Sequence, residues 1–198
     1  MRIMIAVSVR DLLQCYSRLL SCEGTQVDTA FDGVQTLTKL AKGGVDLLIV
    51  SGDIQRVDYR KIIAHAKGQG VPTIALLSGR VKLSELIGSA PANDYLALPF
   101  SPDELRNAIA ALKAKLASDE ELRFPGFSVR TADFSLRGIP LTAGEIDILK
   151  ALHDGDCRPG SDKDVYINAL NEKLARLHQP QWIHYEKQKG YRMVTGNE

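Results

Sequence analysis

The stretch "DLLIVSGDIQ", residues 46–55, decides how the first part of this chain folds. Its apolar run at 47–50 ends at a polar residue, Ser51, with Asp53 two positions further on. A short run that is apolar throughout is typical of a strand covered on both faces of a parallel sheet. Because such sheets keep their ligand sites at the carboxyl ends of the strands, Ser51 stands where chemistry is expected.

Similar short runs repeat on both sides of this stretch. They predict strands at 2–8, 26–31, 46–51, 73–78 and 95–99. Amphipathic patterns between and after them predict helices at 10–21, 33–42, 57–67, 81–88 and 102–116. Five such units with right-handed crossovers indicate an α/β fold with a five-stranded, parallel, doubly wound sheet.

The alternation stops at an acidic run and a Pro-Gly pair in "ASDEELRFPGF", residues 117–127. We therefore expect a first domain at 1–118, a linker at 119–126 and a smaller α+β domain at 127–198. The second domain is predicted to contain short strands at 127–130 and 134–138, a helix at 141–152 with a capping box of Thr142 and Glu145, a helix at 161–177 and a closing hairpin at 181–194.

Composition excludes several classes of protein. The 198 residues are 44% hydrophobic and 25% charged with a net charge of +1, and no apolar run is long enough for a membrane span. The opening "RIMIAV" reads as a core strand, so a cytoplasmic protein is expected. The three cysteines, Cys15, Cys22 and Cys157, lack CxxC spacing and a nearby histidine, which predicts reduced thiols, no metal and no cofactor.

Four patches in order resemble one family of proteins. They are "NDYLALPFSPDEL" (93–105), "LTAGEIDILKAL" (141–152), "DVYINALNEKL" (164–174) and "KGYRMV" (189–194). Together they resemble response regulators of the OmpR/PhoB type over nearly the whole chain. The resemblance implies a flavodoxin/CheY-like receiver domain followed by a winged-helix effector domain.

The resemblance also implies a phosphorylation site, and this sequence departs from it. In the family an aspartate ends the third strand, an acidic pair after the first strand holds Mg²⁺, a hydroxyl ends the fourth strand and a lysine precedes the proline of the fifth. The matching positions here are Val7, Ser8, Ser51, Leu77 and Leu98. Because metal and lysine neutralise the charge of phosphoryl transfer, we expect a pseudo-receiver that is not phosphorylated and is not an enzyme.

Ser51 has two open interpretations. In the first it is a small filler bonded to the backbone, with Val7, Leu77 and Leu98 converging on it in an apolar patch. In the second, Asp53 serves as a displaced phosphate acceptor, although no acidic pair is present to seat Mg²⁺.

The resemblance implies a homodimer through the fourth helix, the fifth strand and the fifth helix. Candidate interface residues are Glu85, Asp94, Tyr95, Ala108 and Ala111. The alanines of the fifth helix stand where arginines are common in relatives. They are either plain helix formers or a close-packed dimer face that forms without phosphorylation.

The second domain carries an uncertain DNA-binding pattern. Residues 1–118 hold 14 Lys/Arg against 11 Asp/Glu, whereas 119–198 hold 11 against 13. From 163 to 192, however, six basic residues outnumber three acidic ones. Candidate DNA contacts are Lys163, Asn168, Arg176, Lys187, Lys189 and Arg192. The alternative is an ordinary solvated helix face.

A deletion separates this chain from the family pattern. Only "HDGDCRPGS" (153–161) joins the two helices of the second domain, where relatives carry about 20 residues more, including a helix and a loop that commonly contacts RNA polymerase.

Two functions stay open. The first is a phosphorylation-independent, dimeric transcription regulator that binds DNA. The second is an interaction module that modulates another regulator or RNA polymerase without binding DNA.

Overall fold

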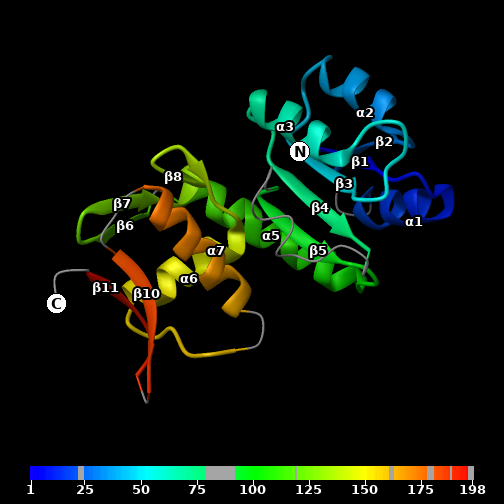
Figure 1. Cartoon of the computed structure of the whole chain (residues 1–198). Coiled ribbons are helices and arrows are strands. Elements are labelled where there is room, and N and C mark those ends of the chain that lie inside the picture. Colours follow the sequence, from blue (N-terminus) through cyan, green and yellow to red (C-terminus); the bar gives the residue numbers. More distant parts are fainter. Residues whose placement is uncertain are drawn as a thin grey trace. The chain divides into compact units, whose positions relative to one another are not determined.

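The computed structural model describes residues 1–21, 25–78, 92–118, 120–160, 163–177, 181–187 and 189–195 (Figure 1). The chain forms two compact units, Met1–Ala110 and Ala111–Glu198. The helix expected at 81–88 lies outside the described residues, as does Glu85. Among the helices that are described, none has the length and apolar content needed to cross a bilayer.

The first unit contains a five-stranded parallel sheet, which confirms the predicted fold class. Its strands are β1 (Arg2–Ala6), β2 (Gln26–Ala30), β3 (Leu47–Ser51), β4 (Thr73–Leu77) and β5 (Asp94–Ala97). Their spatial order is β2-β1-β3-β4-β5, so β2 and β5 form the edges. Every residue of β3 and β4 is buried, as their uninterrupted apolar runs predict.

Four described helices accompany these strands: α1 (Arg10–Ser21), α2 (Gly33–Leu40), α3 (Tyr59–Gly68) and α5 (Pro102–Ala117). Three begin at side-chain caps, and Asp58 accepts the Arg60 amide at the start of α3. Asp32 accepts the Gln35 amide at the start of α2, and Ser101 and Glu104 exchange hydrogen bonds at the start of α5. Such caps satisfy amides that a helix leaves without partners, so they fix where each helix starts.

The pleat of the strands divides the buried residues between the two faces of the sheet. One cluster joins Ala6, Val50 and Leu77 with Ile62 and Ile63 of α3. Since side chains alternate along a strand, the intervening buried residues point to the opposite face. This alternation decides which side chains surround Ser51.

The second unit begins with strands in the stretch expected to be a linker. Strand β6 (Glu121–Phe124) pairs with β7 (Phe127–Arg130). Residues 119–126 are therefore not only a linker: Leu122 is buried, and the Pro-Gly pair forms the turn of a hairpin. A turn and a flexible connection have similar composition, so the sequence pattern did not separate them.

The rest of the second unit follows the predicted order. A 3₁₀ turn (Thr131–Asp133) precedes the short strands β8 (Ser135–Leu136) and β9 (Ile139–Pro140), the helices α6 (Ala143–His153) and α7 (Lys163–Arg176), and the hairpin β10 (Gln181–Glu186) and β11 (Gly190–Thr195). The capping box of Thr142 and Glu145 at the start of α6 is confirmed. The turn of the hairpin includes Gln188, which lies outside the described residues.

Candidate functional site

Ser51 ends β3 as a buried side chain that is bonded to the backbone. It is 6% exposed, and its Oγ accepts the Asp53 amide at 3.2 Å. Ser8, at the second position of the expected acidic pair, accepts the Gln55 amide through its Oγ at 3.0 Å. Both hydroxyls therefore bond to the backbone of the loop that follows β3, as the filler interpretation of Ser51 expects.

A small pocket of about 70 Å³ lies at the carboxyl edge beside Ser51. Val7 and Leu98 line it, in agreement with the predicted apolar patch, and Leu12 and Tyr16 of α1 close it. Tyr16 stacks on Phe100 with ring centroids 5.2 Å apart. The lining of this pocket is mainly aliphatic and aromatic carbon, and its polar members are Ser8, Ser51 and Asp53.

Leu77 does not belong to this patch, which corrects the prediction. It packs in the cluster with Val50 and Ala6 on the opposite face, and Leu76 lines the pocket instead. The register explains the difference, because Leu76 pairs with Ser51 across β3 and β4 and the two side chains share a face.

The next residue, Ser78, is a hydroxyl that the sequence pattern missed. It follows β4 immediately, and its Oγ is buried without a hydrogen-bond partner in the described structure. The Leu98 amide donates to the Leu77 carbonyl at 2.7 Å, so the backbone hydrogen bonds between β4 and the segment that follows β5 continue as far as Leu77. A hydroxyl therefore does follow the fourth strand, one residue beyond Leu77.

Asp53 lines the mouth of the pocket and is exposed. Among the described residues, no three His, Cys, Asp or Glu side chains come together in a group that could hold a metal ion. Of the cysteines, Cys157 is buried and Cys15 is exposed, and both are free thiols. Cys22 lies outside the described residues.

In the second unit, a buried ion pair joins α6 and α7. Lys173 is 4% exposed, and its Nζ donates to both carboxylate oxygens of Glu145 at 2.6 and 2.7 Å and to the Pro140 carbonyl at 2.8 Å. Burial lowers the pKa of the Lys173 ammonium, and the Glu145 carboxylate opposes that effect. Lys173 is therefore not among the basic side chains that a ligand could contact.

Side chains of α7 also hold the terminal hairpin. The Asn171 amide accepts the Ile183 N–H at 2.7 Å and donates to the Ile183 carbonyl at 3.1 Å. The Tyr191 hydroxyl donates to Asp164 at 2.7 Å, and this bond raises the pKa of Tyr191 to about 12. The side chain of Asn171 therefore serves the fold, because both its oxygen and its nitrogen are bonded to the hairpin backbone.

The shortened connection between α6 and α7 packs against the same hairpin. The Cys157 carbonyl accepts the Tyr191 amide at 2.7 Å. A side chain at Gly190 would place its Cβ 2.5 Å from that carbonyl oxygen. The short connection is therefore a strap that binds the wing hairpin (β10 and β11) through the backbone.

The candidate DNA contacts divide into an exposed group and one outlier. Asn168, Arg176, Lys187, Lys189 and Arg192 are exposed on α7 and the wing hairpin. Lys163 is half-buried and lies about 140° around the helix axis from Asn168, so these two residues do not share a face. Lys189 pairs with Glu186 at 2.9 Å, whereas within the described residues no ion pair involves Lys187.

The candidate dimer residues lie on β5 and α5. Ala108 is half-buried and Ala111 is exposed on α5, three positions apart. Tyr95 packs against the core cluster and accepts the Ala92 amide through its hydroxyl at 3.0 Å. Asp94 accepts the Tyr95 amide.

Comparison with known proteins finds relatives over nearly the full chain. A response regulator, MprA of Mycobacterium tuberculosis (strain H37Ra), is 26% identical over 221 residues, which cover 96% of both chains. This alignment is longer than the 198 residues of the present chain, so the relative has residues that this chain lacks. No family model matches the sequence.

Two solved structures show the same fold. A mutant of RitR superposes over 98% of this chain and 99% of its own, with a TM-score of 0.68 and 19% identity. The signal receiver domain of an HD domain-containing protein from Pseudomonas fluorescens Pf-5 has a TM-score of 0.51 and 27% identity, and it covers 55% of this chain and 83% of its own. These matches bear out both the receiver fold and the two-part architecture.

Proposed function

The homologues of this chain are response regulators of the OmpR type, and from this premise we propose a function. We propose that the protein regulates transcription by binding DNA and that it does so without phosphorylation. The observation that carries the second half is the pocket beside Ser51. Phosphoryl transfer to a receiver needs a carboxylate nucleophile and positive charge that stabilises the transferred group. Here the end of β3 supplies a hydroxyl that is already bonded, and Leu98 occupies the position of the lysine.

Incubation with acetyl phosphate and Mg²⁺ should leave the intact mass and the dimer fraction unchanged. Mass spectrometry and analytical ultracentrifugation measure these two quantities. A conventional receiver of the same family, treated in parallel, shows that the reagent is active. A phosphorylated peptide containing Asp53 would contradict the proposal, because it would show that this exposed carboxylate is a working acceptor.

DNA binding is supported by the exposed cations of α7 and the wing hairpin. Arg176, Lys187, Lys189 and Arg192 can each neutralise a phosphate, since a phosphate contact requires only charge and reach. Base reading is limited, because Asn168 is the only side chain of the candidate set suited to adenine. We therefore expect binding that depends strongly on salt and weakly on sequence.

If four cations contact phosphates, the affinity for duplex DNA should fall roughly 150-fold between about 50 and about 200 mM salt. Lys187→Ala should reduce the slope of log affinity against log salt by about 0.9. Fluorescence anisotropy of a labelled duplex measures both effects. Lys113→Ala, an exposed lysine on α5, is the matched control and should leave the slope unchanged.

The second candidate is a protein-interaction module that acts on another regulator or on RNA polymerase. The inward use of Lys173 and Asn171 favours it, because both leave α7 with fewer groups for DNA. Absence of duplex binding even at low salt would favour this module over the DNA-binding proposal. For the dimer, Ala108 and Ala111 are the proposed contacts on α5, together with Asp94 and Tyr95 of β5.

A further inference from the structure

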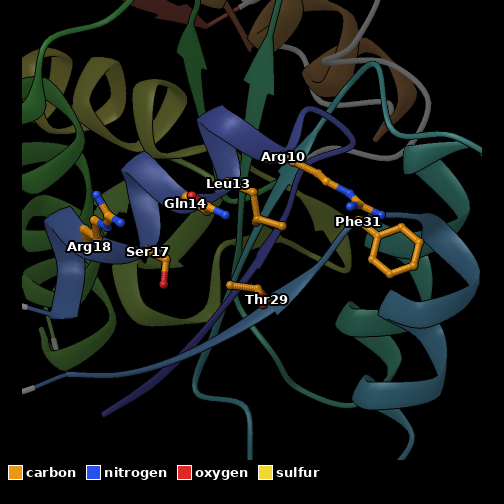
Figure 2. Close-up of a pocket in the computed structure, with 7 residues that line it drawn as sticks. All are labelled: Arg10, Leu13, Gln14, Ser17, Arg18, Thr29 and Phe31. Carbon is orange, nitrogen blue, oxygen red and sulfur yellow. The ribbon is translucent and has the colours of Figure 1, made fainter.

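A groove of about 470 Å³ lies between α1 and the edge strand β2 in the first unit (Figure 2). Strand β2 is at the edge of the sheet and has a neighbouring strand on one side only. Leu13, which is buried, forms its apolar floor, and Thr29 and Phe31 form the wall contributed by β2 and the residue after it. Its volume is in the range of sites for small organic ligands.

The charge of the groove is one-sided. Arg10 and Arg18 of α1 line it, and no acidic residue does among the described residues. The two arginines are eight positions apart on the helix, which separates their backbones by about 12 Å along the axis. Figure 2 shows the Arg10 side chain extended toward Phe31 and Arg18 at the far end of the helix.

The groove also contains polar groups without partners. The side chains of Gln14, Ser17 and Thr29 make no hydrogen bond within the described part of the chain, and Arg10 forms no ion pair there. Hydrogen-bonding groups that line a concave site and remain unused in the fold are available to orient a ligand. A guanidinium without a carboxylate partner can donate two parallel hydrogen bonds to a pair of oxygens on a carboxylate or a sulfonate.

Two side chains of α2 bond to the backbone of the wall that Thr29 and Phe31 form. The Phe31 amide donates to the Gln35 side chain at 2.9 Å, and Lys39 Nζ donates to the Thr29 carbonyl at 2.6 Å. Phe31 is nevertheless 45% exposed. An aromatic side chain whose backbone is held in place, and whose ring is open to water beside a cation, provides a surface for an aromatic ligand.

We infer that the groove between α1 and β2 binds a small organic anion with an aromatic body. The ring of the ligand packs on Leu13 and Phe31, its anionic group pairs with Arg10, and the unused polar side chains of the groove accept or donate hydrogen bonds along its length. This site does not depend on whether the second unit binds DNA.

Fluorescence titration of the full chain with 8-anilinonaphthalene-1-sulfonate, an aromatic sulfonate, tests the inference. Saturable binding to one site is expected. Arg10→Gln should raise the Kd about tenfold or more because it removes the charge that pairs with the anion. Phe31→Ala should raise it about fivefold because it removes the apolar wall. Both substitutions are at exposed positions, and circular dichroism checks that the variants fold.

Arg60→Gln is the matched control, since Arg60 is exposed on α3 and pairs with Asp58 outside the groove; its Kd should stay within about twofold of that of the unmodified chain. Benzoate should displace the probe, whereas benzamide, a neutral molecule of the same shape, should not. Equal displacement by the two compounds, an unchanged Kd for Arg10→Gln, or binding without saturation would each overturn the inference.

Discussion

Replacing Lys173 with methionine is expected to lower the free energy of unfolding of the second unit by about 3–5 kcal/mol. The change leaves the fully buried Glu145 carboxylate without its cation, and an unpaired buried charge is among the most costly defects in a fold. Trp182 is the single tryptophan of the chain and lies on β10, so its fluorescence during denaturation reports on this unit.

Glu145→Gln should cost a similar amount, because it leaves the Lys173 ammonium buried without an anion while keeping an oxygen for the cap at Thr142. The double variant should be more stable than the sum of the two losses predicts, since both charges are then removed. Lys150→Met is the matched control. Its ammonium pairs with Glu120 at a partly exposed position, where such a pair contributes less than about 1 kcal/mol. A loss for Lys173→Met no larger than this would show that the buried pair does not hold α7.

Replacing Gly190 with alanine should destabilise the second unit by about 2–4 kcal/mol. Two effects add. Gly190 has a φ of +83°, a left-handed conformation that side chains disfavour, and its new Cβ would lie 2.5 Å from the Cys157 carbonyl oxygen. Because the strap from α6 to α7 is bonded to the wing hairpin at this point, we expect the hairpin to lose hydrogen-exchange protection first.

Gly138→Ala separates the two effects. Gly138 has nearly the same φ, +85°, but no atom lies within 4 Å of the position that the alanine methyl would take, so only the backbone strain of about 1–2 kcal/mol remains. Equal losses for Gly138→Ala and Gly190→Ala would show that the contact with Cys157 contributes nothing to holding the hairpin.

Much of the fold could be predicted from the sequence because it depends on local patterns. Apolar runs located all five strands of the sheet to within two residues at either end, and cap residues such as Thr142 located the start of α6. The strand β6 was not predicted. Its acidic and Pro-Gly composition is shared by turns and linkers, and only the pairing with β7 distinguishes the two.

The candidate site could be predicted less completely. The sequence correctly predicted that Ser51 ends β3, but it placed Leu77 beside Ser51, where the structure has Leu76. A shift of one residue at the end of a strand moves a side chain to the other face, so the register with β3 had to be known. Ser78 was missed for the same reason.

The sequence by itself determined the order of strands and helices and the residue types at the carboxyl ends of the strands, because residue identity and short-range periodicity are properties of the chain. Only the tertiary structure decided which polar residues face outward. Lys173 and Glu145 are 28 residues apart, and Asn171 and Ile183 are 12 apart. Whether such groups bind each other or a ligand depends on which surfaces the fold brings together, and burial makes their mutual contact more favourable than leaving either one unpaired.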